Sequence, residues 1–253
     1  MIEITDLVKT YDTVTALKGL TLQIPGGQIF GFLGHNGAGK STTIKCLTSI
    51  IEASSGSIKF DGLELAENRL AIKGRIGYVP DTPDLFLQLS AGEYWNLVAA
   101  AFNLTEDQKN AQLTSLTRLF DLEDKADEAI EGFSHGMRQK VIVIGALLSN
   151  PDIWILDEPL QGLDPQAAYD LKELMKAHAA QGKTVIFSTH ALETAQALCD
   201  QLAILKAGEL IYTGTVNALL EQAGDDSLEA VYLRMAGRQS QEEGAVKHES
   251  TTD

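Results

Sequence analysis

The stretch Gly34–Ser41 (GHNGAGKS) constrains the fold of this chain more than any other part of its sequence. It follows a short apolar run, Gln28–Leu33, and leads into Thr42–Ile51, which has helical spacing. In this strand–loop–helix setting the pattern GxxxxGK[ST] points backbone N–H groups and a helix N-terminus at phosphate oxygens, whereas a chance glycine-rich loop would lack the flanking elements. Lys40 is predicted to reach the β- and γ-phosphates as a catalytic cation, and Ser41 to bind Mg²⁺ through its hydroxyl. The residues predicted to bind the nucleotide here are Gly34, His35, Asn36, Gly37, Ala38, Gly39, Lys40, Ser41 and Thr42.

A second apolar run, Ile153–Leu156, ends in two carboxylates, Asp157 and Glu158. A buried strand of this kind carries Asp157 to the carboxyl edge of a sheet, where it can hold Mg²⁺ through water. Glu158 lies one residue further along and is predicted to polarise the attacking water as the general base. The pattern is weak on its own, because many solvated strand ends look alike. A phosphate loop upstream favours the functional interpretation.

Short apolar runs alternate with amphipathic stretches along most of the chain, which predicts an α/β fold: a P-loop NTPase core with a mainly parallel sheet. Two turn signals beside strands, Asp61-Gly62 and Ala207-Gly208, predict an antiparallel β edge as well. Asp164-Pro165 supplies an N-cap and a first-turn proline for a helix. The predicted strands are Ile2–Thr5, Leu20–Ile24, Gln28–Leu33, Ser57–Phe60, Ile76–Val79, Ile153–Leu156, Thr184–Ser188, Leu202–Leu205 and Leu210–Thr213.

From about 84 to 151 the strand pattern stops, and an inserted helical subdomain is expected. Ser90–Glu93 and Thr105–Gln108 are capping boxes, in which the first and last side chains satisfy free helical amides reciprocally, and each predicts the start of a helix. A third helix is expected over about Gly136–Ser149, ahead of a proline. Almost nothing apolar remains in 237–253, which is predicted to be a disordered tail.

The net charge of −15 argues against several classes of function. Nucleic-acid binding and docking on anionic lipid both require a basic surface, so neither is expected. No run approaches the ~18 apolar residues of a membrane span, and the first residues (MIEITDLVKT) lack the basic and apolar regions of a signal peptide. A cytoplasmic protein is expected, one that reaches a membrane only through a protein partner. Cys46 and Cys199 are expected to be reduced thiols.

Three further stretches complete the set of motifs. These are Phe133–Met137 (FSHGM) at a helix start, Gly162–Pro165 (GLDP), and Ser188–His190 (STH) after an apolar strand. Together with the phosphate loop and the Asp-Glu pair, they make residues 1–236 resemble the ABC ATPase family. A kinase or GTPase built on the same phosphate loop would leave these three stretches unexplained.

The resemblance implies a role for each matching residue. Ser134 and Gly136 would contact the γ-phosphate of a nucleotide held by a second subunit, so that two ATP molecules lie between two head-to-tail subunits. His190 would contact the same γ-phosphate from within its own subunit, as a further catalytic residue, and Asp164 would cross the dimer interface. Tyr11 matches the aromatic residue that stacks on adenine in this family.

Two places depart from the family's usual pattern. The family's glutamine after the strand Ile76–Val79 is Asp81 here, which we expect to act on Mg²⁺ directly or through a water, as a subfamily variation. His135 and Met137 replace the third and fifth residues of the commonest signature, LSGGQ. Methionine at the fifth position is frequent among drug and polysaccharide exporters. Since every hydrolytic residue is present, an inactive relative is not expected.

The resemblance therefore implies the ATP-binding and hydrolysing subunit of an ABC transporter, with ATP and Mg²⁺ as cofactors. Its expected partners are a second ATPase subunit, identical or not, and a separate integral membrane permease that holds it at the inner face of the cell membrane. The stretch Ser227–Met235 resembles the short C-terminal helix of exporter-type subunits, so export is expected rather than import. The alternative is a soluble ABC ATPase of translation or DNA repair, although the chain has neither a second ATPase domain nor a long coiled coil.

The segment 81–132 carries eleven acidic and only three basic side chains. Solubility alone would explain an acidic lobe. The other explanation is that it matches the Lys- and Arg-rich cytoplasmic loops of membrane proteins, and in this family the permease would dock near the loop after Val79. The predicted contact core is Leu85, Phe86, Leu87, Tyr94 and Trp95, with Asp84 and Glu93 as rim charges.

Overall fold

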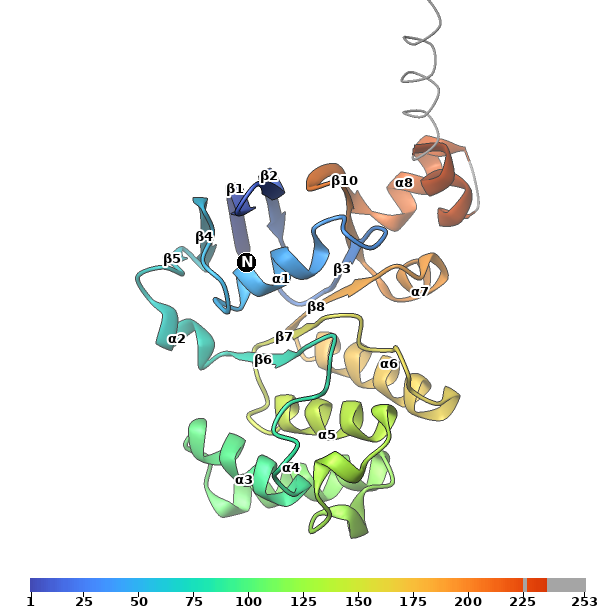
Figure 1. Cartoon of the computed structure of the whole chain (residues 1–253). Helices are drawn as coiled ribbons and strands as arrows, with labels where there is room; N and C mark the ends of the chain where they lie inside the picture. The colour runs from blue at the N-terminus through green and yellow to red at the C-terminus, as the bar shows by residue number, and fades with distance from the viewer. Residues whose placement is uncertain (225–226, 236–253) are drawn as a thin grey trace, which may run out of the picture.

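The computed structural model describes residues 1–224 and 227–235, which form two β-sheets with a helix between them and a helical lobe below (Figure 1). The larger sheet has the strand order β10-β9-β3-β8-β7-β6, and all of its pairs are parallel except β9 with β10. Its central strands are buried on both faces, which is why they read as continuous apolar runs. The strands are β3 (Ile29–Leu33), β6 (Ile76–Val79), β7 (Ile153–Leu156), β8 (Thr184–Thr189), β9 (Gln201–Lys206) and β10 (Glu209–Thr215).

The second sheet is entirely antiparallel, with the order β2-β1-β4-β5. The expected α/β fold is confirmed, but the antiparallel part is larger than an edge, because β1 pairs as far as Tyr11 and not only to Thr5. Register shifts between Ile4 and Leu7 interrupt the alternation of buried and exposed side chains, so the hydrophobic pattern ends before the pairing does. The strands are β1 (Ile2–Tyr11), β2 (Val14–Ile24), β4 (Ser55–Phe60) and β5 (Leu63–Glu64).

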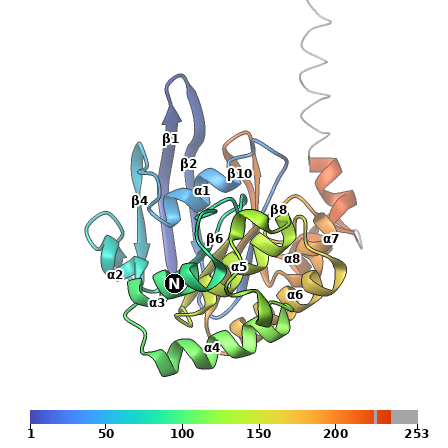
Figure 2. The same ribbon diagram turned by 60° about the horizontal axis from the view of Figure 1, so that its bottom comes forward.

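Helix α1 (Lys40–Leu47) lies between the two sheets (Figures 1 and 2). Ile44 and Leu47 on this helix are fully buried and belong to a core that both sheets share. Because α1 packs against both sheets, the loop between β3 and α1 is anchored at both of its ends. The phosphate loop predicted from the sequence is therefore held in a rigid setting.

The helical lobe contains α3 (Ala91–Ala101), α4 (Glu106–Leu119) and α5 (His135–Leu147). Both capping boxes are confirmed, with Ser90 and Thr105 as the N-caps of α3 and α4. Trp95 is fully buried, and its Nε1–H donates to the Val141 carbonyl oxygen at 3.0 Å. The prediction that Trp95 and Tyr94 form a contact surface is therefore wrong, since Tyr94 is also buried and both pack the inside of the lobe.

The other helices are α2 (Arg69–Lys73), α6 (Pro165–Ala180), α7 (Leu192–Leu198) and α8 (Val216–Ala223), with short 3₁₀ turns at η1 (Glu123–Lys125) and η2 (Ile130–Gly132). As predicted, Asp164 is the N-cap of α6 and Pro165 its first residue. A further helical stretch covers 228–235 and packs Leu228 and Val231 beside the β9–β10 hairpin. The tail predicted at 237–253 lies outside the described residues. Within the described parts of the chain, no helix is both long and apolar enough to cross a bilayer.

Candidate active site

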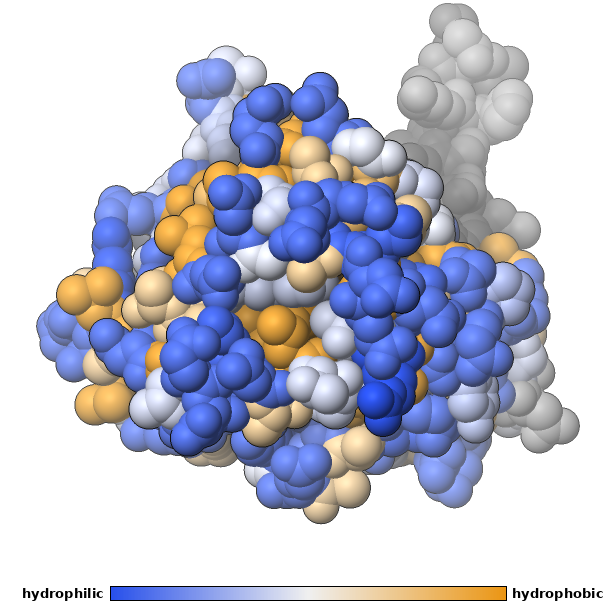
Figure 3. All heavy atoms as spheres, turned by 90° about the horizontal axis from the view of Figure 1, so that it is seen from below, coloured by the Kyte–Doolittle hydropathy of each residue, from blue (hydrophilic) through white to orange (hydrophobic). Residues whose placement is uncertain are grey.

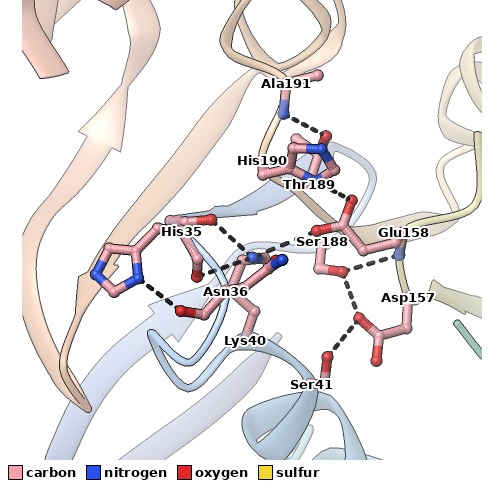
Figure 4. A network of polar contacts seen from close by, with 11 residues as sticks. His35, Asn36, Lys40, Ser41, Asp157, Glu158, Ser188, Thr189, His190 and Ala191 are labelled. Atoms are coloured by element: carbon pink, nitrogen blue, oxygen red, sulfur yellow. Dashed lines mark hydrogen bonds and ion pairs between the residues drawn. The ribbon is translucent and has the colours of Figure 1, made fainter. Parts of the chain in front are cut away.

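The phosphate loop connects β3 to α1 and leads Lys40 into the body of the protein. Gly39, at the N-cap of α1, has φ 110°, and a Cβ added there would lie 2.9 Å from Leu17 Cδ2. The position therefore requires glycine. The Lys40 side chain is only 5% exposed, and its Nζ donates to the carbonyl oxygens of Gly34 at 2.7 Å and His35 at 3.3 Å (Figure 4). The loop thus binds the cation through its own carbonyl groups.

Asp157 follows the last residue of β7 and is completely buried. Its Oδ1 accepts hydrogen bonds from the hydroxyls of Ser41, at 3.1 Å, and Ser188. Burial raises the pKa of Asp157, the two hydroxyl hydrogen bonds oppose that shift, and the charges of Asp81 and Glu158 add to it. Among the described residues nothing donates to Asp157 Oδ2, although that atom is buried. A buried carboxylate oxygen without a donor, beside a hydroxyl, suits a bound cation.

Glu158 is held between residues from two other parts of the chain. Its Oε1 lies 3.3 Å from Lys40 Nζ, and its Oε2 lies 3.0 Å from Nδ1 of His190, which follows the end of β8 (Figure 4). The backbone of Glu158 has φ 47°, in the left-handed region, and its N–H donates to Ser188 Oγ at 2.9 Å. A strained backbone, secured by a hydroxyl, aims this carboxylate back at the phosphate loop.

A cavity of about 880 Å³ opens in front of these residues. Its walls combine the start of β2, the phosphate loop, the start of α1, the loop after β6 and the start of α5. Asp81, the residue at the family's glutamine position, lines this cavity and is exposed. The lining residues are Val14, Thr15, Ala16, Lys18, His35, Asn36, Gly37, Ala38, Gly39, Lys40, Ser41, Thr42, Asp81, Thr82, His135, Glu158, Gln161 and Ala207.

The structure does not bring Tyr11 into the wall of this cavity, although the resemblance implied that it stacks on adenine. Tyr11 ends β1, opposite Val14, and its ring lies 5.0 Å from Lys9 Nζ in a cation–π contact. Val14 and Ala16, two residues from the following strand, line the cavity instead. The wall at the first residues of β2 is therefore made by the small and branched side chains of Val14, Thr15 and Ala16.

Ser134 and Gly136 also lie outside this cavity lining. Ser134 is exposed at the N-cap of α5, where its Oγ accepts from the N–H of Met137 at 3.3 Å. Gly136 passes so close to Gly162 that an added Cβ would lie 2.6 Å from the Gly162 carbonyl oxygen. The signature stretch is thus packed on the Gly162–Pro165 turn with its serine facing outward.

Asp164 is occupied within its own chain. Its Oδ1 accepts from the N–H of Ala167 at 2.8 Å, and its Oδ2 forms an ion pair with Lys140 of α5 at 3.0 Å. These two partners lower the pKa of Asp164, in that order of importance. The carboxylate joins the signature helix to α6 within one subunit.

Ser188 was not predicted as a site residue, yet its hydroxyl bridges Asp157 and the backbone of Glu158. The available signal was its place two residues before His190, at the end of an apolar run. A hydroxyl at a strand end is common, so sequence alone could not assign it a partner. Lys18 lines the cavity as well, but its Nζ forms an ion pair with Glu209 at 3.1 Å.

Comparison with known proteins gives consistent matches. The family model for ABC transporters matches residues 17–161. The ABC-type transporter ATP-binding protein EcsA of Bacillus subtilis is 36% identical over 237 residues, which covers 93% of this chain and 96% of EcsA. The Nod factor export ATP-binding protein I of Burkholderia pseudomallei is 34% identical, over 90% of this chain and 75% of that protein.

Solved structures agree with these matches. A structure of the ATP-binding subunit of an ABC transporter aligns with a TM-score of 0.88 at 35% identity, and the alignment covers 93% of this chain and 99% of that one. A dimeric bacterial ABC transporter cassette aligns with a TM-score of 0.77 at 25% identity, over 85% of this chain and 99% of that one.

Proposed function

Because this chain belongs to the ABC transporter family of ATP-binding proteins, we propose that it is the ATPase subunit of an exporter, paired head-to-tail with a second ATPase subunit beneath a separate membrane permease. Membership of the family makes the chain an ATPase that binds ATP. The dimer, the direction of transport and the permease are the proposed parts. The observation that carries the proposal is the exposure of Ser134 outside the cavity around Lys40, since the site within the chain already holds Glu158 between Lys40 and His190.

The chemistry proposed for this site uses residues already in place. The phosphate loop binds the β- and γ-phosphates through its N–H groups and Lys40. The γ-phosphate would draw Lys40 away from Glu158, which leaves that carboxylate free to accept a proton from the attacking water. His190, 51% exposed, would keep Glu158 oriented and contact the γ-phosphate from the same side. Each residue thereby has one partner before nucleotide arrives and another afterwards.

Mg²⁺ is proposed to bind with the nucleotide. Ser41 and Asp157 would hold it, and Asp81 would contact it or its water, since the buried Oδ2 of Asp157 lacks a donor among the described residues. No group of three or more His, Cys, Asp or Glu side chains in 1–224 and 227–235 could hold a metal by itself. Mg²⁺ ordinarily takes its remaining ligands from phosphate and water, so a site completed by ATP is expected. The bound ion would neutralise charge on the phosphates and on these carboxylates.

The proposed dimer follows from the location of the signature stretch. Ser134 is exposed and lies outside the cavity that its own chain forms around Lys40. A site that needs both must take Ser134 and Gly136 from a second subunit. A head-to-tail pair supplies them twice, once for each nucleotide. The dimeric cassette that aligns with this chain is consistent with such a pair.

Mixing two inactive variants tests this arrangement. Lys40→Ala removes nucleotide binding but leaves the signature stretch intact, and Ser134→Asp spoils the signature stretch but leaves the phosphate loop intact. Their heterodimer has one complete site, so an equal mixture should recover about a quarter of the wild-type turnover if pairing is random. Each variant assayed alone should stay inactive. A mixture no more active than the sum of its parts would refute the shared site.

Export and the place where the permease docks are each supported by a separate observation. The similarity to a Nod factor export protein favours export. Leu85 and Phe86, in the loop after β6, are 41% and 50% exposed, and the lobe around them is mostly hydrophilic with a few apolar patches (Figure 3). This agrees with an apolar contact core inside an acidic rim. A subunit docked in this way would lie at the inner face of the membrane.

The rim charges chosen from the sequence are unsuitable for testing that surface. Asp84 forms an ion pair with Arg138 at 2.6 Å, and Glu93 accepts from the Ser90 N–H at 2.7 Å in a capping box. Asp127→Lys, at an exposed position, is the better reversal and should weaken recovery of the permease from membranes, more so at low salt. Glu221→Lys on α8, also at an exposed position, is the matched control. If only the control variant lost recovery of the permease, the docking face would lie elsewhere on the subunit.

A further inference from the structure

The loop that follows β6 and the loop that leads into the signature serine are bonded to each other along their length. The N–H of Ile130 donates to the Leu89 carbonyl oxygen at 2.9 Å. The N–H of Glu131 donates to the Leu87 carbonyl oxygen at 3.0 Å. An isolated β-bridge extends the same antiparallel pairing just beyond these bonds. The two loops therefore form a short ribbon within the helical lobe, although they are about forty residues apart in the chain.

Arg138 fastens this ribbon to the signature helix. It lies in the first turn of α5, and its side chain is 21% exposed. Its Nε and Nη2 donate to the carbonyl oxygens of Ile130 and Glu131, at 3.2 and 2.6 Å. Its Nη1 forms an ion pair with Asp84 at 2.6 Å. One planar guanidinium thus binds both loops at once, which the single ammonium of a lysine could not do in this geometry.

The ribbon and Arg138 join two exposed places, the loop after Asp84 and the start of α5. Leu85 and Phe86, directly after Asp84, are half exposed. Ser134, one helical turn before Arg138, is exposed at the start of α5. The hydrogen bonds and the ion pair that link these ends are each 3.2 Å or less, so the two loops and the start of α5 are joined directly.

We propose that Arg138 is a positioning residue that fixes the signature serine relative to the loop 84–89. The inference rests on the proposed function, since Ser134 is taken to act on the nucleotide of a second subunit. Arg138 touches neither nucleotide nor water in this mechanism. Its effect is on how readily two subunits close, and not on how well one subunit binds ATP.

The test separates these two quantities. Turnover of the soluble chain is measured against protein concentration, and ATP affinity of the monomer is measured separately by equilibrium binding. Arg138→Met should raise the concentration needed for half-maximal turnover by about fivefold or more, because three hydrogen bonds to a charged group are lost. Monomer ATP affinity should stay within about twofold of wild type, since the phosphate loop is untouched.

Two more variants distinguish positioning from general loss of structure. Asp84→Asn should give a smaller shift, and adding it to Arg138→Met should change little, because the two side chains act as one pair. Arg138→Lys should rescue part of the effect, through the charge alone. Glu123→Gln is the matched control: it removes the Arg118–Glu123 ion pair, 3.1 Å long and exposed, from the same lobe.

Failure of this inference and failure of the shared site give different results. A wild-type rate strictly proportional to concentration would contradict the shared site. In that case amide hydrogen exchange at 130–134 still tests whether Arg138 positions this segment, since Arg138→Met should speed exchange there in the full chain. The proposal would be overturned if Arg138→Met exchanged these amides at the wild-type rate. It would also be overturned if the turnover of wild type rose faster than linearly with protein concentration and Arg138→Met showed the same dependence. An equal shift in Glu123→Gln would overturn it as well.

Discussion

The phosphate-binding region and the signature region of this chain are built in opposite ways. Around the phosphate loop, polar side chains are buried and bonded to one another: Lys40 is 5% exposed, and Asp157 accepts from Ser41 and Ser188. At the start of α5, Ser134 is exposed and its hydroxyl oxygen accepts only from the backbone of its own helix among the described contacts. The polar groups of one region are bonded within the chain, whereas the serine of the other is exposed.

The difference shows where this ATPase can be controlled. The buried groups around the phosphate loop all belong to one chain, so nucleotide binding exchanges partners among them and needs no second surface. In the proposed head-to-tail pair, Ser134 acts only when a second subunit brings its nucleotide. Binding of ATP should therefore be a property of one subunit, whereas turnover should depend on assembly. The predictions below run from the largest expected effect on turnover to the smallest.

Glu158→Gln should lower hydrolysis by ~10²-fold or more, because the amide keeps the shape of the side chain but cannot accept a proton. ATP binding should survive, and a dimer trapped with ATP should accumulate on size-exclusion chromatography. The measurement is phosphate release together with elution volume. Hydrolysis at the wild-type rate would remove Glu158 from the role of general base.

Ser134→Asp separates the two roles open to this serine. Aspartate caps a helix as well as serine does, so the stability of α5 should be unchanged. Its negative charge would repel a γ-phosphate brought by a second subunit, and turnover should fall at least about tenfold. Thermal unfolding and turnover are measured on the same preparation. A variant with normal turnover would leave Ser134 as a helix cap alone.

Asp81→Ala should raise the Mg²⁺ concentration needed for half-maximal activity by a few-fold, because Asp81 lines the cavity and its carboxylate would be lost from beside the proposed Mg²⁺ site. Asp81→Gln, which restores the family's usual residue, should be milder. Magnesium titrations of the three proteins test this at fixed ATP. Identical titrations would make Asp81 a solvated loop residue.

His178→Gln should leave turnover unchanged at neutral pH and alter only the stability of the core. His178 is buried on α6 against Trp154, and burial is the main reason that its pKa falls from 6.5 to about 4, with the charge of Lys183 adding to the shift. A depressed histidine pKa contributes stability that is present above about 6.5 and is lost as pH falls toward 4. At pH 5 the loss should be about 2 kcal/mol in the wild type.

Denaturant unfolding of wild type and His178→Gln at pH 7 and pH 5 measures this loss. The variant should show a smaller decrease in unfolding free energy over that interval. An equal decrease in both proteins would assign the acid sensitivity to other groups.

Much of the fold could be predicted because its signals are local. The phosphate loop, the two capping boxes and the apolar runs of β3, β7 and β8 each depend on residues within one short stretch. The hydrogen bonds of both capping boxes are present, and they could be predicted because each joins a side chain to an amide only three residues away. The motifs also placed Lys40, Glu158 and His190 at strand and helix ends, although the distances among them could not be predicted.

Only the tertiary structure decided which side chains contact each other when they are far apart in the sequence. In the folded chain Arg138 pairs with Asp84, and Glu158 pairs with His190. Trp95 is buried and donates to the Val141 carbonyl oxygen, and the Tyr11 ring lies beside Lys9. The sequence by itself determined the family, the phosphate loop and the helix starts, because periodicity and capping act within a few residues. It left open which charged side chains are free and which are bonded, because that depends on segments that the folded sheets bring together.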